Sequence, residues 1–158
     1  MANQPRWQSM LMLVLFVVIC FGVSAVGAQF QPGEWYQQLY KSPLTPPNWI
    51  FAPVWAALYL AMAVAAWLVW RSATASRILP LSLFGLQLFL NAIWSWLFFG
   101  LHEPGLAFID IILVWCAIVA TAVAFWKVNT VAGVLFLPYI AWVSFAGYLN
   151  FEIWRLNP

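Results

Sequence analysis

Five long apolar runs, separated by short polar segments, constrain this chain more than any other feature. The runs cover about residues 7–28, 49–70, 81–100, 104–126 and 131–151. Each is roughly 20 residues long, which is the length that an α-helix needs to cross the hydrocarbon core of a bilayer. None shows the two-residue alternation of a transmembrane β-strand. Because lipid offers no partners to backbone polar groups, these runs are predicted to be helices.

The scarcity of charged side chains excludes a soluble domain of this size. Only 6% of the residues are charged, whereas soluble proteins carry about 25%. The sequence has no cluster of basic residues of the kind that binds nucleic acid. We therefore predict an all-α integral membrane protein, surrounded by the lipid bilayer. Residues 1–158 would form a single domain of five transmembrane helices, with one long loop between the first two.

The first run also has features of a secretory signal peptide. Arg6 precedes it, and Val26-Gly27-Ala28 is similar to a signal-peptidase site. The run is longer than the apolar part of such a peptide, which has about 7–15 residues. We expect the segment to be retained as a membrane helix, and cleavage after Ala28 is the alternative.

Basic side chains are unevenly distributed between the two ends of the predicted spans. Four fall on the side of the N-terminus, Arg6, Arg71, Arg77 and Lys127, and two on the other side, Lys41 and Arg155. Lysine and arginine are enriched in cytoplasmic loops. The N-terminus is therefore predicted to lie in the cytoplasm, and the long first loop on the opposite side of the membrane.

That first loop and its flanks, residues 35–55, carry aromatic residues at both ends and the pair Pro46-Pro47 in the middle. Proline fixes the backbone and removes a hydrogen-bond donor, so the pair interrupts regular structure. We predict that this segment forms the lid and upper wall of a pocket inside the helix bundle.

The chain contains twelve tryptophans; Trp35 lies in the polar first loop, and the others fall into two groups. Those at the ends of spans fit an interfacial aromatic belt: Trp7, Trp49, Trp67, Trp70, Trp126 and Trp154. Trp55, Trp115 and Trp142 lie deeper in their runs. Because lipid has no acceptor for an indole N–H, we expect these to turn inward toward a partner. Trp94 and Trp96 fit either group.

Polar residues inside the runs also point inward. Gln87 and Asn91, one helical turn apart, either bond between helices or line a ligand cavity. Asp110 lies about two turns into its run and is expected to face the bundle or a polar cavity, because a charge facing lipid is costly. Aromatic walls with few polar groups suit a flat, largely apolar ligand.

No set of residues in the sequence indicates catalysis or a resident metal. His102 is the only histidine and lies in a short turn, which argues against a haem held by an axial histidine. Cys20 and Cys116 lie in apolar runs and are expected to be small buried hydrophobic residues. We expect no catalytic residue, no metal site and no obligatory cofactor.

Short motifs along almost the whole chain resemble the translocator protein family, also called tryptophan-rich sensory proteins or peripheral-type benzodiazepine receptors. They are Trp35-Tyr36, Lys41-Ser42-Pro43, Pro46-Pro47, Val54-Trp55-Ala56, Gln87-Leu88, Asn91, Trp94, Phe98-Phe99-Gly100, Pro138-Tyr139, Trp142, Leu149-Asn150-Phe151 and Arg155. The resemblance implies a five-helix bundle, usually a homodimer, with a ligand pocket under the first loop. Members are associated with porphyrins, sterols and isoquinoline- or benzodiazepine-type drugs.

By this resemblance, Trp55 and Trp142 match tryptophans placed to contact the ligand, while Tyr36, Asn91 and Ala146 match positions in or beside the pocket. The resemblance and the residue patterns together give one predicted ligand-binding set. It consists of Trp35, Tyr36, Pro46, Trp49, Trp55, Tyr59, Gln87, Asn91, Trp94, Asp110, Trp142 and Ala146.

The sequence departs from the family pattern at two places. Ser95-Trp96 stands where a proline-containing pair is common, so we expect the end of the third helix to differ. Phe151 replaces the tyrosine of the sterol-recognition pattern, and Tyr148 lies too far from Arg155 to complete it.

Porphyrin is therefore the favoured ligand over a sterol. The expected protein is a porphyrin receptor or sensor in a bacterial cytoplasmic membrane, linked to tetrapyrrole metabolism or stress regulation. The alternatives are a transporter of porphyrin or of sterol-like molecules, and light-dependent porphyrin breakdown.

Overall fold

The computed structural model describes residues 5–30, 32–72 and 76–158, and the regular structure in these ranges is helical throughout. The elements are α1 (Arg6–Gly27), α2 (Glu34–Gln38), the 3₁₀ turn η1 (Asn48–Ile50), α3 (Phe51–Arg71), α4 (Ile78–Ser95), the π-helical turn η2 (Trp96–Gly100), α5 (Pro104–Val128), α6 (Thr130–Val134) and α7 (Leu137–Leu156). This confirms the all-α fold class.

Five stretches are long and apolar enough to cross a membrane: Arg6–Gly27, Asn48–Arg71, Ile78–Gly100, Pro104–Val128 and Thr130–Leu156. The third begins earlier than the predicted Leu81, and Pro80 is accommodated in its first turn because those N–H groups have no helical partner. The fifth continues past the predicted Phe151, and Glu152 and Arg155 form an ion pair on its last turn.

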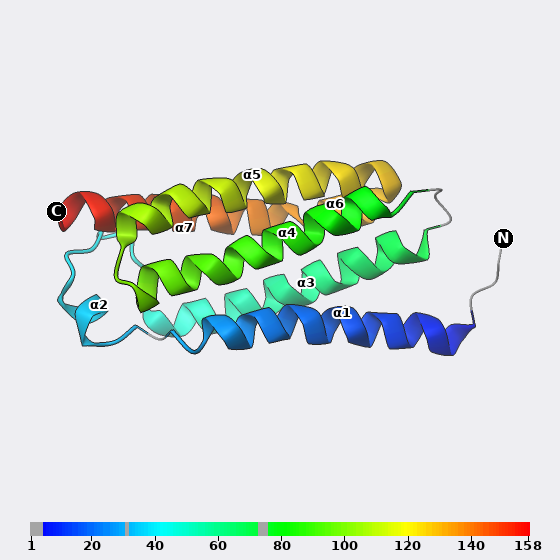
Figure 1. The fold of residues 1–158 in the computed structure, drawn as a ribbon, viewed down its shortest axis with the longest axis horizontal. Helices are drawn as coiled ribbons and strands as arrows, with labels where there is room; N and C mark the ends of the chain where they lie inside the picture. Colours follow the sequence, from blue (N-terminus) through cyan, green and yellow to red (C-terminus); the bar gives the residue numbers. More distant parts are fainter. Residues whose placement is uncertain (1–4, 31, 73–75) are drawn as a thin grey trace.

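The long helices lie side by side along one axis, with the small helix α2 at the end where the chain terminates (Figure 1). α5 packs against α4, α6 and α7, and buries nine residues. α1 packs against α3 and α4 but buries only Phe16 and Cys20. α1 is therefore a peripheral helix, whereas α5 is central to the bundle.

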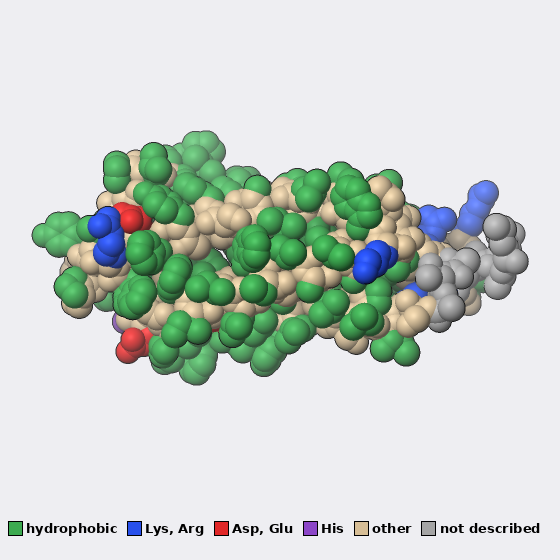
Figure 2. Space-filling model, turned by 90° about the horizontal axis from the view of Figure 1, so that it is seen from above, with side chains coloured by type: hydrophobic (Ala, Val, Ile, Leu, Met, Phe, Trp, Pro, Cys, Tyr) green, Lys and Arg blue, Asp and Glu red, His purple; other side chains and the backbone are tan. Residues whose placement is uncertain are grey.

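Hydrophobic side chains cover the middle of the molecule, and charged side chains gather toward its ends (Figure 2). At the end of α3, Arg71 lies over the ring of Trp67, and the guanidinium carbon of Arg77 lies 6.0 Å from the ring centroid of Trp70. Such pairs place indole rings beside cationic groups at the headgroup level. The surface therefore has an apolar band between charged ends, as a membrane-spanning bundle requires.

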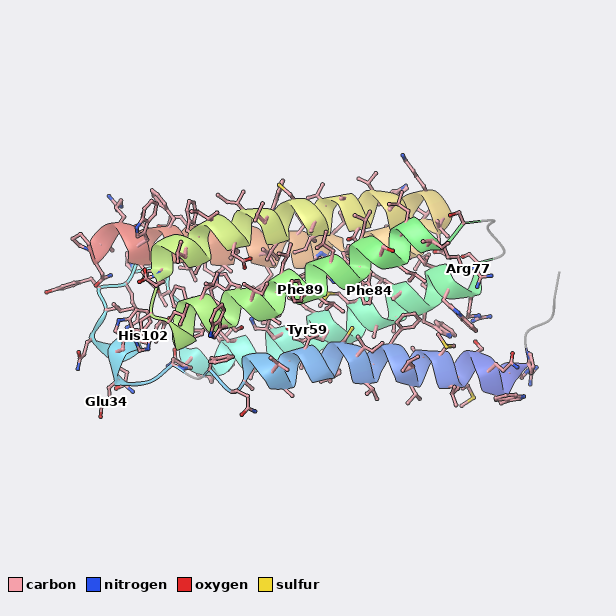
Figure 3. The ribbon with its side chains drawn as sticks, viewed as in Figure 1. Glu34, Tyr59, Arg77, Phe84, Phe89 and His102 are labelled. Atoms are coloured by element: carbon pink, nitrogen blue, oxygen red, sulfur yellow. The ribbon has the colours of Figure 1, made fainter. Side chains whose placement is uncertain are left out.

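One end of the bundle has a closely packed core. The ring of Phe125 stacks on Phe84 at 6.0 Å between centroids and meets Phe136 edge-on at 5.2 Å. Small residues of α3, including Ala63 and Ala66, are fully buried beside them. Figure 3 places Phe84 between Arg77 at this end and Tyr59 nearer the loop end, where Glu34 and His102 lie.

Two of the long helices are irregular where the sequence departs from a simple apolar run. At the end of α4 the helix widens into η2, and the N–H of Leu101 donates to the carbonyl of Trp96 at 2.8 Å. The third span therefore ends in a π turn and not in a regular α-helical turn. Between α6 and α7 the helix is interrupted just before Pro138, which has no N–H to continue the bonding pattern.

The expectation that all deep tryptophans turn inward is wrong for Trp115. Its side chain is 38% exposed on α5, and its Nε1 donates to Ser144 Oγ at 2.8 Å. A neighbouring helix thus supplies the acceptor on the outer surface, so burial is not required. Cys116 beside it is also exposed, contrary to expectation, whereas Cys20 is fully buried.

Candidate functional site

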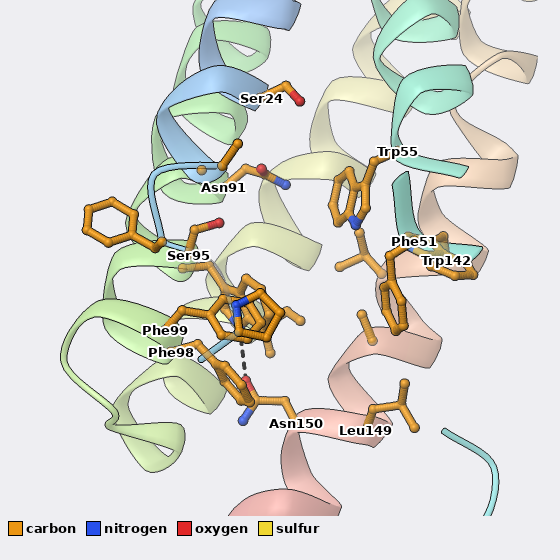
Figure 4. Close-up of a pocket in the computed structure, with 18 of the residues that line it drawn as sticks. Ser24, Phe51, Trp55, Asn91, Ser95, Phe98, Phe99, Trp142, Leu149 and Asn150 are labelled. Carbon is orange, nitrogen blue, oxygen red and sulfur yellow. Dashed lines mark hydrogen bonds between the residues drawn. The ribbon is translucent and has the colours of Figure 1, made fainter. Parts of the chain in front are cut away.

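A cavity of about 430 Å³ lies inside the bundle at the end covered by the first loop (Figure 4). Residues from α1, α2, α3, α4, η2, α5 and α7 line it, and none of its lining side chains is charged. Pockets for small molecules measure about 300–1,000 Å³ and are mostly apolar. The size and chemistry of this space therefore fit a small-molecule ligand.

The wall formed by α3 and α7 consists of aromatic rings. Trp55 lies 5.5 Å from Tyr59 between ring centroids, and Phe51 meets Trp142 edge-on at 5.7 Å. The Nε1 atom of Trp142 is buried and has no hydrogen-bond partner within the described chain. A buried unpaired donor costs about 1–3 kcal/mol. A ligand acceptor that reaches this atom would recover that cost.

The facing wall, from α4 and η2, is a second aromatic cluster. Trp94 stacks on Phe98 with 5.0 Å between centroids, and Phe99 meets Phe98 edge-on at 4.8 Å. Trp94 Nε1 donates to Asn150 Oδ1 at 2.9 Å, and Asn150 Nδ2 donates to the carbonyl of Pro104 at 2.8 Å. These bonds hold the indole in place and tie α4, α5 and α7 together around the cavity, and Figure 4 marks the bond to Asn150 Oδ1.

The π turn explains why both phenylalanines belong to this cluster. Phe98 follows Trp94 by four residues and Phe99 follows it by five. In an α-helix, a residue four positions after Trp94 lies on the same face, but a residue five positions after it does not. The wider π turn brings the residue five positions on to that face as well. Both rings consequently line the cavity.

Tyr36 of α2 forms the roof of the cavity. Its ring meets Phe99 edge-on at 5.6 Å between centroids, and Lys41 Nζ lies 4.5 Å from its ring centroid. Lys41 also donates to the carbonyl of Leu39 at 3.3 Å, which places the ammonium group over the ring. Burial raises the pKa of the Tyr36 hydroxyl above its usual value of about 10, so this hydroxyl is neutral at neutral pH.

A second contact attaches the loop to the bundle beside the roof. The ring of Trp35 stacks on His102 with 4.3 Å between centroids, and meets Phe98 edge-on at 5.8 Å. His102 adopts a left-handed backbone conformation, with φ of 58°, in the turn between η2 and α5. This turn therefore presents the imidazole to the loop, and Trp35 positions the lid without lining the cavity.

A chain of buried hydrogen bonds forms the floor. Tyr59 Oη donates to Asn91 Oδ1 at 2.9 Å, Asn91 Nδ2 donates to Tyr139 Oη at 3.0 Å, and Tyr139 Oη donates to Gln87 Oε1 at 3.0 Å. The chain connects α3, α4 and α7. Because an amide nitrogen carries two hydrogens, Asn91 retains one donor that it can offer to the cavity.

The structure brings together most of the predicted ligand-binding residues, although binding itself stays a prediction. The cavity is lined by Tyr36, Trp55, Tyr59, Asn91, Trp94, Trp142 and Ala146. The structure does not place the others on its wall: Trp35, Pro46, Trp49, Gln87 and Asp110. Trp49 is 73% exposed, as an interfacial residue would be, and Gln87 is fully buried in the floor network beneath Asn91.

Asp110 faces the bundle, but it does not reach the cavity. Its side chain is 6% exposed, and its Oδ2 atom has no hydrogen-bond partner in the described chain. The sequence pattern predicted a residue turned away from lipid, and the burial agrees with that.

Sequence reasoning missed several lining residues that helical spacing could have found, and Phe51 and Asn150 are two examples. Phe51 precedes Trp55 by four residues, and Asn150 follows Ala146 by four. Residues four apart share a helix face. Extending the faces already identified on α3 and α7 by one turn would have included both.

The fold and the cavity define a class of protein: a multi-pass helical membrane protein with an uncharged, aromatic cavity under its first loop. In the described ranges, no group of three or more His, Cys, Asp or Glu side chains is placed to hold a metal. The model of the TspO/MBR family matches residues 12–155, so this chain belongs to the TspO/MBR family.

Similar proteins come from bacteria and animals. Protein CrtK of Rhodobacter capsulatus is 39% identical over 152 residues, which covers 95% of each chain. The tryptophan-rich protein TspO of Chlorobaculum tepidum is 40% identical over 158 residues, 96% of this chain and 99% of its own. The translocator protein of Bos taurus is 41% identical over 138 residues, 84% of this chain and 82% of its own.

Proposed function

We propose that this protein is a membrane receptor or sensor that binds a porphyrin, such as protoporphyrin IX, in the cavity under its first loop. The observation that carries the proposal is the pair of facing aromatic walls, with Trp55 and Trp142 on one and Trp94 on the other, on either side of a cavity of about 430 Å³. Aromatic rings favour flat ligands by stacking and edge-on contacts. Porphyrins and related flat hydrophobic molecules have this shape.

The uncharged lining limits how such a ligand can lie. Burying a carboxylate without a partner is very costly. The propionate groups of a porphyrin would therefore stay at the loop end, near the water-facing side of the roof. The apolar ring edge would enter first, toward the floor at Asn91.

The direct test compares a double variant of the cavity with a matched double variant of the surface. Trp55→Phe with Trp142→Phe should weaken protoporphyrin IX binding about tenfold, because two indole contacts are reduced. Trp7→Phe with Trp126→Phe removes two exposed indoles outside the cavity and should leave affinity unchanged. Binding is followed by the porphyrin absorbance, since tryptophan fluorescence changes in each variant. Equal affinity of the cavity variant and the wild type would reject this site.

Light-dependent porphyrin breakdown is a second candidate, supported by the placement of Trp55 and Trp142 in the same cavity wall. Illumination of the purified complex would then yield a bilin-like product, and the double cavity variant would not form it.

Transport of porphyrin or of a sterol-like molecule is a third candidate. Labelled porphyrin that stays outside proteoliposomes would exclude it.

We also infer a homodimer and an N-terminus in the cytoplasm. Ala57, Ala61 and Ala65 recur every four residues on α3, a spacing that allows close helix packing, but they do not form one surface, because Ala57 is exposed and Ala65 is fully buried. Gly85 on α4 is exposed, and a Cβ there would have no neighbour within 4 Å, so this face has space for a second copy. Crosslinking in lipid through a Gly85→Cys variant in a Cys116→Ser background tests the interface. Protease access to the N-terminus in inverted vesicles tests the orientation.

A further inference from the structure

A second hollow lies on the outside of the bundle, at the end away from the cavity. It is a groove of about 340 Å³ between the last turns of α5 and the α6–α7 segment. Its lining includes Ala122 and Val123 of α5, Gly133 of α6, and Leu137 and Ile140 of α7. Trp126 and Lys127 line it at the end of α5.

Small residues and the interrupted helix create the groove. A Cβ on Gly133 would lie 2.7 Å from the Cβ of Trp126, a distance that no ordinary side chain tolerates. Glycine therefore lets α6 approach α5 closely at this point. One turn earlier, Ala122 leaves space beside Ile140, and the helix interruption before Pro138 separates α6 from α7.

The body of the groove is apolar and faces the surface of the bundle. On α5, Val119, Ala122, Val123 and Trp126 recur at spacings of three and four residues, so they share one helix face. Val123 is 51% exposed and Leu137 is 50% exposed. In a membrane, this face borders the acyl chains of the lipids, so a hydrocarbon chain is the molecule that reaches the groove.

A cation completes the groove at its end. Lys127 is exposed, and the ion pair in the described chain, Arg155 with Glu152, does not involve it. Arg71 and Arg77 lie at the same end of the bundle. Basic residues near a membrane surface attract anionic lipid headgroups, each by about 1 kcal/mol. The free ammonium group thus provides charge complementarity for a phosphate.

We propose that this groove binds one anionic phospholipid, with an acyl chain against Ala122, Val123 and Ile140 and the headgroup phosphate on Lys127. Trp126, whose ring lies at the same end, would face the headgroup region, where indoles are favoured. A second copy of the chain fits this surface less well. It would bury Lys127 without a partner, and an unpaired buried charge is strongly destabilising.

The test is native mass spectrometry of the full-length protein, with titrated phosphatidylglycerol or phosphatidylcholine of the same acyl chains. The wild type should retain phosphatidylglycerol about fivefold better than phosphatidylcholine, and Lys127→Gln should remove that preference. Arg6→Gln is the matched control, because it removes a cation at the same end, on α1, which does not line the groove. It should retain the preference.

A second variant distinguishes binding of the lipid's acyl chain from binding of its headgroup. Val123→Trp fills the groove from an exposed position and should reduce retention of both lipids by a similar factor. The proposal is overturned if Lys127→Gln keeps the wild-type preference, or if Arg6→Gln loses it equally. Occupation of the groove by a second copy, seen as a dimer that Val123→Trp dissociates, would also overturn it.

Discussion

The same helices are packed differently in the two halves of the bundle. Toward Arg77 the space between helices is filled by Phe84, Phe125 and Phe136. Toward the first loop the helices instead surround an open cavity, and its walls are held by hydrogen bonds such as that from Trp94 to Asn150. The first half is stabilised by contact between side chains, and the second by bonds that position rings around a space.

The difference between the two halves arises because this protein is surrounded by lipid and not by water. Lipid tails are as apolar as leucine, so burying apolar side chains gives little net gain, and membrane helices associate through close packing and interhelical hydrogen bonds. Close packing fills the first half. In the second half, the chain from Tyr59 through Asn91 and Tyr139 to Gln87 supplies the bonds that keep the helices together without filling the space.

Phe136→Ala should reduce the stability of the protein most, because it opens a cavity in the closely packed half of the bundle, toward Arg77. Phe136 is fully buried between Phe125 and Tyr139. The free energy of unfolding should fall by about 3 kcal/mol, measured by steric trapping in bicelles. Leu137→Ala, at a half-exposed neighbour, is the control and should change it far less. Equal losses in the two variants would mean that this half is not closely packed.

Tyr139→Phe should rank second, because it breaks the hydrogen-bond chain under the cavity. The change leaves Asn91 Nδ2 and Gln87 Oε1 without their shared partner. We expect a loss of about 1–3 kcal/mol in the same assay. Tyr40→Phe, at a ring that is 75% exposed, serves as the comparison. Stability unchanged by Tyr139→Phe would show that the network does not hold the helices.

Trp142→Phe should have a smaller effect on stability, although it lines the cavity. Its Nε1 donor has no partner in the described chain, so its removal costs no hydrogen bond. We expect a change of less than about 1.5 kcal/mol, because the part of the ring that is lost borders an existing cavity and opens little new space. A larger loss than in Tyr139→Phe would indicate that this half depends on ring packing after all.

The smallest expected effect is a loosening of the loop that carries the roof residue Tyr36, and it appears only at alkaline pH. Burial raises the pKa of the Tyr36 hydroxyl above 10.0, so the docked loop is stable below that pH and loses stability as the pH rises through the folded-state pKa. A nitroxide at a Gln38→Cys position, in a Cys116→Ser background, should become more mobile above about pH 10. Tyr36→Phe should reduce this change.

The ammonium group of Lys41 also lies over the Tyr36 ring, so this contact contributes to holding the roof in place. A Lys41→Met variant therefore separates the two contributions. If both variants keep the full wild-type response, the alkaline change does not arise at the roof.

Several site residues were predictable because a single helix presents them. Trp55 and Tyr59 share a face of α3, and Trp142 and Ala146 share a face of α7, at four-residue spacing. Residues whose placement depends on another element were harder to predict. Trp115 has the same depth in its run as Trp142, yet it lies outside, where Ser144 of a neighbouring helix accepts the hydrogen bond from its indole N–H.

The sequence by itself determined that the chain is a helical membrane protein with five spans, because apolar length and missing charge admit no other structure in lipid. It also indicated which helix faces turn inward. The tertiary structure decided that one end of the bundle is open and the other filled, since that depends on which side chains of different helices meet. Helical periodicity is a property of one segment, whereas a cavity is a property of the distances between several.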